Sequence, residues 1–126
     1  MRAHYLDYIA ALNARRFDDL GAYVADRLTY NERPLTLAEY RALLVEDVRR
    51  IPDLHYDVRQ LVVEGETVAS RIRFACTPRE PFHGLEPTGR PVVFDEHVFY
   101  RFASGRIAEV WSLLDLDGLR RQLAAR

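Results

Sequence analysis

VVFDEHVFYRFASGRIAEVWSLL, residues 92–114, is the stretch that decides the fold. It is rich in β-branched and aromatic residues, which favour the pleated, half-buried surface of a sheet. We predict two long strands, Val92 to Phe102 and Arg106 to Leu114, joined by the turn residues Ala103-Ser104-Gly105. The stretch therefore indicates an antiparallel hairpin.

The turn decides which side chains share a face of the hairpin, because a one-residue slip moves every side chain to the other face. A two-residue loop would pair Ala103 with Arg106. A three-residue loop with Gly105 in the left-handed conformation would pair Phe102 with Arg106 and form a glycine bulge. Glycine at the third loop position favours the longer loop, which predicts the pairs 102–106, 97–111, 95–113 and 93–115.

That register separates a mixed face from a more apolar one. The mixed face would carry Val93, Asp95, His97, Phe99, Arg101, Ile107, Glu109, Trp111, Leu113 and Asp115. The other would carry Phe94, Glu96, Val98, Tyr100, Phe102, Ala108, Val110, Ser112 and Leu114. Pockets combine apolar walls with a few convergent polar groups, so we predict that the mixed face lines a pocket. The second face is too apolar for bulk solvent, so we expect helices on one face and a second subunit on the other.

The first half of the chain reads as helical. Apolar residues recur near helical spacing from Tyr5 to Val24, with a break expected near residues 13–17. A short strand is expected from Leu28 to Tyr30, followed by a turn at residues 31–34. Thr36 and Glu39 form a capping box for another helix, which ends before Pro52.

The second half reads as strands. Residues 54–64 and 67–77 predict a hairpin, and a loop rich in proline and glycine follows at residues 78–91. The tail, Asp115 to Arg126, predicts a short helix. Helices followed by an antiparallel meander indicate an α+β fold with helices on one face of a curved sheet.

Composition bounds the function. A length of 126 residues with 48% hydrophobic residues predicts one domain, residues 1–126. The net charge of −1 argues against nucleic acid or an anionic membrane as a partner. All 18 basic residues are Arg, which we interpret as a GC-rich coding bias typical of a bacterial genome. Without a signal-like or membrane-spanning segment, we expect a cytoplasmic location.

Cysteine and histidine usage bounds the chemistry. The one cysteine, Cys76, lies in a strand-like run, where a small buried apolar residue is expected. The four histidines, at positions 4, 55, 83 and 97, lack short ligand spacing, so we predict no metal site.

Several motifs, in order, resemble the SnoaL-like polyketide or ester cyclase family, which has the nuclear-transport-factor-like cone fold. They are Tyr30-Asn31-Glu32-Arg33-Pro34, Ile51-Pro52-Asp53-Leu54, Phe82 to Val92 with its Pro87-Thr88-Gly89-Arg90, Phe99-Tyr100-Arg101-Phe102, Gly105 to Glu109, and Trp111-x-x-x-Asp115. The chain departs from the family pattern at Cys76-Thr77-Pro78, where the family often has Gly-Thr-His. It also departs at Glu109-Val110-Trp111, where the family often has Glu-His-Trp.

The resemblance implies a curved antiparallel sheet wrapped around the N-terminal helices, enclosing a pocket, and a homodimer through the outer sheet face. It implies intramolecular aldol cyclisation of a small hydrophobic carbonyl compound, without metal or cofactor. Asp115 would be the general acid/base, His97 its partner, and Asn31 a carbonyl-orienting group. Asp95, Phe99, Trp111 and Leu113 would complete the pocket.

Other interpretations of these residues stay open. Asp115 lies where a strand becomes a helix and would serve equally as an N-cap. His97 would also fit a satisfied core histidine, and Asn31 an ordinary turn residue. Asp95 would pair with Arg101 on one strand face, with Glu109 opposite Arg101 across the hairpin. The alternative functions are an epoxide hydrolase or isomerase, for which Asp95, Arg101 and Asp115 loosely mimic the required set, and a non-catalytic ligand-binding or dimerisation module.

Overall fold

A computed structural model describes residues 1–125. The helices are α1 (Arg2–Asn13), η1 (Phe17–Ala22, a 3-10 helix), α2 (Leu37–Arg50) and α3 (Leu116–Ala124). The strands are β1 (Val24–Tyr30), β2 (Arg33–Thr36), β3 (Asp57–Glu64), β4 (Thr67–Cys76), β5 (Val92–Ala103) and β6 (Arg106–Leu114). The last residue of the predicted C-terminal helix, Arg126, lies outside the described residues.

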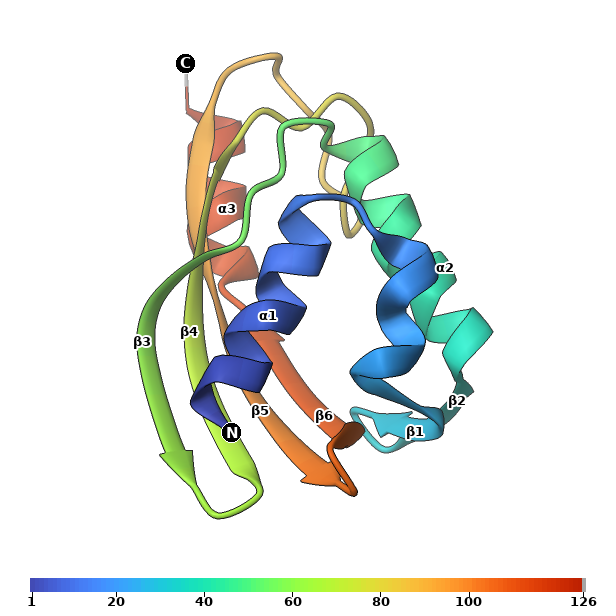
Figure 1. Cartoon of the computed structure of the whole chain (residues 1–126). Coiled ribbons are helices and arrows are strands. Elements are labelled where there is room, and N and C mark those ends of the chain that lie inside the picture. Colours follow the sequence, from blue (N-terminus) through green and yellow to red (C-terminus); the bar gives the residue numbers. More distant parts are fainter. Residues whose placement is uncertain (126) are drawn as a thin grey trace.

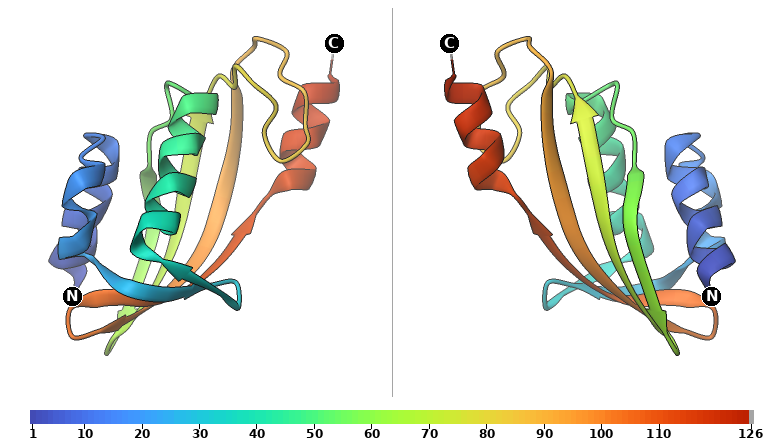
Figure 2. Two further views of the ribbon diagram at one scale, coloured as in Figure 1. Left: turned by 90° about the vertical axis from the view of Figure 1, so that its right-hand side faces the viewer. Right: turned by 90° about the vertical axis from the view of Figure 1, so that its left-hand side faces the viewer.

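One curved sheet organises the chain, with strand order β2-β1-β6-β5-β4-β3. Helices α1 and α2 lie on one side of the long strands β4 and β5, and α3 lies on the other side, near their upper ends (Figures 1 and 2). This arrangement confirms the predicted α+β fold with helices against a curved sheet. Among the described residues, no helix is long and apolar enough to cross a membrane.

Local signals in the sequence account for most of the elements. The capping box is present, since the Thr36 hydroxyl accepts from the backbone N–H of Glu39 and the Glu39 carboxylate accepts from that of Thr36. The predicted break after α1 is confirmed, and the β3–β4 hairpin turns at Gly65, which has φ 57°.

One expectation about the first half of the chain is wrong. Residues 33–36 form strand β2 rather than the end of a turn, because Asn31 and Glu32 both adopt positive φ and make a tight hairpin between β1 and β2. The antiparallel meander predicted for the second half is present as β3, β4, β5 and β6, and β1 and β2 extend the sheet beyond it. β1 pairs with β6 in parallel, which brings the turn after β1 beside the last hairpin.

The turn between β5 and β6 differs from the predicted one. Ala103 pairs with Arg106, so the loop is the two residues Ser104 and Gly105, with φ of 52° and 78°. Positive φ at both positions is the two-residue hairpin geometry that matches strand twist. The predicted glycine bulge is therefore wrong.

A register shift between Arg101 and Phe102 follows the turn instead, and it leaves Ala108 as the extra residue of a bulge. The bulge restores the predicted grouping of odd-numbered residues beyond it, although His97 pairs with Leu113 rather than with Trp111. Ile107 moves to the buried side with Phe102.

The assignment of the two hairpin faces is reversed in the structure. Phe99, Trp111 and Leu113 of the mixed face are 55%, 42% and 73% exposed, whereas Phe94, Val98, Tyr100 and Val110 of the other face are buried. The helices cover the more apolar face because burying it removes more apolar area from water. The mixed face is the outer face of the sheet.

Candidate functional site

A small interior cavity lies between the helices and the inner face of the sheet. Its volume is about 50 Å³. Five tyrosines supply its polar wall: Tyr8, Tyr30, Tyr40, Tyr56 and Tyr100. The apolar wall includes Leu12, Leu44, Phe74, Phe82, Phe94 and Val110. Two carboxyl groups, Asp47 and Glu96, complete the lining.

Glu96 reaches the cavity from the middle of β5, between the buried residues Phe94 and Val98. The hydroxyl of Ser112 on β6 donates to its Oε2 at 2.5 Å. Burial raises the pKa of Glu96, and the hydrogen bond from Ser112 opposes that shift. A carboxylate in such surroundings is a stronger base than one in water.

Asp47 reaches the same cavity from α2. Tyr40, Leu44 and Asp47 are spaced three and four residues apart, so the helix presents all three on one face. Burial raises the pKa of Asp47 to about 7, and the negative charge of Glu96 contributes to the shift. Both carboxyls therefore have a raised pKa, and the negative charge of one disfavours ionisation of the other.

Tyr8 and Tyr40 form a hydrogen-bonded pair of hydroxyls at 2.7 Å. One hydroxyl donates to the other, so one O–H of the pair has no partner within the pair. Burial raises the pKa of both hydroxyls well above the usual tyrosine value, which keeps them protonated and able to donate.

The loop between β4 and β5 closes one end of the cavity with Phe82. Phe82 and Leu85 exchange backbone hydrogen bonds across a tight turn, in which His83 and Gly84 have positive φ. The loop is tied to the end of α2, since Arg50 donates to the Pro81 carbonyl and Arg49 pairs with Glu80. The long loop predicted at residues 78–91 thus supplies a wall of the cavity.

The structure places Asp115 and His97 outside this cavity. Both are exposed and border a shallow groove on the outer side together with Leu113. The Asp115 carboxylate accepts from the backbone N–H of Gly118 at 2.9 Å, so it caps α3. The expectation that these two residues face an enclosed pocket is wrong, because the face that carries them is the outer one.

Asn31 also lies away from the cavity. Its side-chain amide bonds the backbone of Ser112, accepting from the N–H at 2.8 Å and donating to the carbonyl at 3.1 Å. These bonds give it a role in joining β1 to β6.

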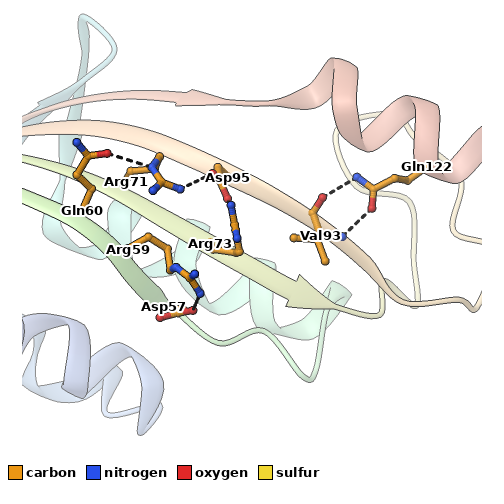
Figure 3. Close-up of polar contacts among 8 residues, drawn as sticks. All are labelled: Asp57, Arg59, Gln60, Arg71, Arg73, Val93, Asp95 and Gln122. Carbon is orange, nitrogen blue, oxygen red and sulfur yellow. Dashed lines mark hydrogen bonds and ion pairs between the residues drawn. The ribbon is translucent and has the colours of Figure 1, made fainter.

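The remaining predicted pocket residues belong to the outer face. Asp95 accepts hydrogen bonds from Arg71 at 2.9 Å and Arg73 at 3.0 Å, and these two cations hold its pKa below the usual range (Figure 3). The predicted pairing of Asp95 with Arg101 is wrong. Arg101 lies six residues further along the strand and pairs with Glu109 at 3.7 Å, as the sequence indicated.

Trp111 is an outer-face residue too, and its indole N–H donates to Glu109 at 2.8 Å. With Arg101 occupied by Glu109, the set of Asp95, Arg101 and Asp115 imagined for an epoxide hydrolase is not assembled. Phe99 and Leu113 lie exposed beside it.

Sequence reasoning missed Glu96, Asp47 and the tyrosines. The sequence did carry a signal for both carboxyls. Glu96 is the one carboxylate on the apolar face of its strand. Asp47 follows the buried Tyr40 and Leu44 at helical spacing. The prediction for Cys76 is confirmed, because its side chain is buried and burial raises the pKa of the thiol to about 12. Within residues 1–125 no group of three or more His, Cys, Asp or Glu is arranged to hold a metal ion.

Comparison with known proteins gives a consistent family assignment. The sequence model of the SnoaL-like polyketide cyclases matches residues 2–123. A SnoaL-like polyketide cyclase from Agrobacterium tumefaciens has 44% identity and a TM-score of 0.93, with 96% of this chain and 95% of that chain covered. A search of curated proteins gave no match.

Two further solved structures share the fold. AclR from Streptomyces galilaeus, a proposed hydroxylase, has 25% identity and a TM-score of 0.79, covering 97% of this chain and 93% of its own. IdmH from Streptomyces antibioticus has 22% identity and a TM-score of 0.86, covering 98% of each chain.

Proposed function

Because the chain belongs to the SnoaL-like polyketide cyclase family, we propose that it performs cofactor-free acid/base chemistry on a small carbonyl compound within its interior cavity. The observation that carries the proposal is the meeting of Glu96 and Asp47 in one cavity walled by tyrosines and apolar side chains. This assignment transfers the acid/base role from Asp115 to the two carboxyls that line the cavity.

Each group has a defined task. The Glu96 carboxylate takes a proton from the carbon next to the substrate carbonyl, and the carbonyl oxygen gains the negative charge of an enolate. The free O–H of the Tyr8–Tyr40 pair donates to that oxygen. In an intramolecular aldol step, the enolate carbon then bonds to a second carbonyl carbon, whose oxygen takes the proton of Asp47. A water molecule then carries the proton that Glu96 took from the substrate to Asp47, which restores both groups for the next turnover.

The size of the cavity restricts the substrate. Pockets for drug-sized ligands usually measure about 300 to 1,000 Å³. The space of about 50 Å³ found here suits a compound of few heavy atoms. We therefore favour a small mono- or dicarbonyl compound over a multi-ring polyketide.

A second copy of the chain is proposed to cover the outer face of the sheet, with both subunits in the cytoplasm. Val62, Val93, Phe99, Trp111 and Leu113 are exposed there, at 42% to 73%. Contiguous exposed apolar residues of this kind mark interaction surfaces. The pairing would bury this apolar face while the cavities stay on the far side of each sheet.

A non-catalytic ligand-binding role is the second candidate. The crowding of the cavity by five tyrosines and three phenylalanines, which leaves little space, favours this alternative. It differs from the first candidate in predicting binding without chemistry.

The test is exchange of α-protons with deuterated water, followed by proton NMR. The probes are small ketones and 1,3-dicarbonyls, from acetone to cyclohexane-1,3-dione. Wild-type protein should accelerate exchange of at least one probe, and Glu96→Gln should lose about 100-fold or more of that rate. Asp7→Asn, at an exposed position of α1, is the control and should keep the full rate.

Two outcomes would overturn the catalytic proposal. Equal exchange with wild type and Glu96→Gln for every probe would remove the role of Glu96. Binding of a probe, seen as chemical-shift changes at cavity residues, without faster exchange would favour the ligand-binding role.

A further inference from the structure

A chain of hydrogen bonds links the turn after β1 to the carboxylate of Glu96. The backbone N–H of Asn31 donates to the Val110 carbonyl at 2.9 Å, which continues the parallel pairing of β1 with β6. The Asn31 side chain then bonds both backbone groups of Ser112, at 2.8 Å and 3.1 Å. The Ser112 hydroxyl in turn bonds Glu96 at 2.5 Å.

The geometry of Asn31 suits this role. Its φ is 48°, in the left-handed region that Asn tolerates better than most residues. In this conformation the chain turns away from β6 toward β2, so the backbone of β1 stops pairing at Tyr30 and Val110. At Ser112 the side-chain amide of Asn31 makes the two hydrogen bonds that a continued β1 backbone would make.

The position of Ser112 matters for the cavity. Ser112 of β6 pairs with Val98 of β5. Its hydroxyl bonds Glu96, which lies two residues before Val98 on the same face of β5. Without the Asn31 amide, the backbone N–H and carbonyl of Ser112 would both lose their hydrogen-bond partner. The Ser112 hydroxyl would then be held less firmly.

We propose that Ser112 and Asn31 are positioning residues for Glu96, Ser112 by donating to its carboxylate and Asn31 by fixing the backbone of Ser112. This inference rests on the proposed function of Glu96 as the base. Neither residue touches the reacting atoms. Their effect is to aim the carboxylate and to stabilise its charged form.

The prediction for Glu96 has a definite direction. A donor that bonds a carboxylate favours the charged form, so loss of the Ser112 hydroxyl raises the pKa of Glu96. The other titratable groups that face Glu96 are Asp47 and several tyrosines, namely Tyr5, Tyr8, Tyr30, Tyr40, Tyr56 and Tyr100. The variants below leave all of these in place.

The test is an NMR titration of the Glu96 carboxyl carbon in ¹³C-labelled full-length protein. Ser112→Ala should move the titration midpoint of Glu96 to higher pH, and Ser112→Thr, which keeps the hydroxyl, should restore it. Asn31→Gly keeps the left-handed backbone and removes the amide, and it should move the midpoint in the same direction by less. In the exchange assay, Ser112→Ala should lose about tenfold of the rate on the acid side of the pH profile.

Gln122→Ala is the matched control. The Gln122 amide bonds both backbone groups of Val93, at 2.7 Å and 2.6 Å, on the same strand as Glu96 but away from the cavity (Figure 3). Its loss should lower stability in the same way as the loss of the Asn31 amide. It should leave the Glu96 titration unchanged.

An unchanged Glu96 midpoint in folded Ser112→Ala and Asn31→Gly would overturn the proposal. So would an equal shift in Gln122→Ala, since the effect would then be a general loosening of the sheet. The NMR titration reports on Glu96 whether or not α-proton exchange occurs. Failure of the proposed reaction, tested by Glu96→Gln, is therefore distinguishable from failure of this inference.

Discussion

Asp47 of α2 and Glu96 of β5 line one interior cavity, and the charge of Glu96 helps to raise the pKa of Asp47 to about 7. The two residues are 49 positions apart in the sequence and belong to different layers of the fold. Two carboxyls that share a cavity and have raised pKa values are suited to acid/base catalysis near neutral pH.

The first prediction concerns stability and pH. The pKa of Asp47 is 3.8, the ordinary value, in the unfolded chain and about 7 in the folded protein. The folded state therefore binds the proton more tightly. Stability is then fully present below about pH 4 and falls as pH rises toward 7, by up to about 4 kcal/mol. Asp47→Asn cannot ionise, so it should lose this pH dependence and be more stable than wild type at pH 8.

Urea unfolding at pH 5 and pH 8 measures the effect. Asp7→Asn, at an exposed position of α1, should follow the wild-type pH dependence. If the difference in unfolding free energy between wild type and Asp47→Asn were the same at pH 5 and pH 8, the raised pKa would be contradicted.

The second prediction concerns the tyrosine pair. Tyr8→Phe or Tyr40→Phe alone leaves one buried hydroxyl without its partner and should cost about 1 to 2 kcal/mol of stability. The double variant removes both hydroxyls and should be less destabilised than the two single effects combined. Its α-proton exchange should fall by about 100-fold, because the donor to the carbonyl oxygen is gone.

A double-mutant cycle by urea unfolding, with exchange rates measured on the same four proteins, provides the check. Additive losses of stability would show that the two hydroxyls act independently. Unimpaired exchange in the double variant would exclude them as the oxyanion donor.

The third prediction separates capping from catalysis at Asp115. Asn is as good an N-cap as Asp, so Asp115→Asn should keep both stability and exchange activity, whereas Asp115→Ala should lose about 1 kcal/mol of stability. Thermal unfolding and the exchange assay together decide the question. A large loss of exchange in a stable Asp115→Asn protein would return the acid/base role to Asp115.

The fourth prediction concerns the outer face. Leu113 is 73% exposed, so Leu113→Glu should not harm the fold but should convert a dimer into a monomer. Leu43→Glu changes a 38% exposed leucine on α2 and should leave the dimer intact. Sedimentation equilibrium distinguishes the cases, and a wild-type monomer would refute the proposed dimer.

The sequence by itself determined the local elements and the class of fold. Strand-forming runs, the capping box at Thr36 and Glu39, and the glycine turns act over a few residues, so they predict α2 and the two hairpins without knowledge of the rest. The order and spacing of motifs also identified the family resemblance. The grouping of odd-numbered residues from Val93 to Arg101 and from Glu109 to Leu113 was also right, although a bulge at Ala108 produces it and Ile107 falls on the other face.

Only the tertiary structure decided which side of the sheet is the inside. Both faces of the hairpin carry apolar and polar residues, and local pattern does not say which face α1 and α2 will cover. Packing chose the face with Phe94, Val98, Tyr100 and Val110, because it buries more apolar surface. That choice exposed Asp115 and His97, turned Glu96 toward the cavity, and brought it together with Asp47, which lies 49 positions earlier on α2.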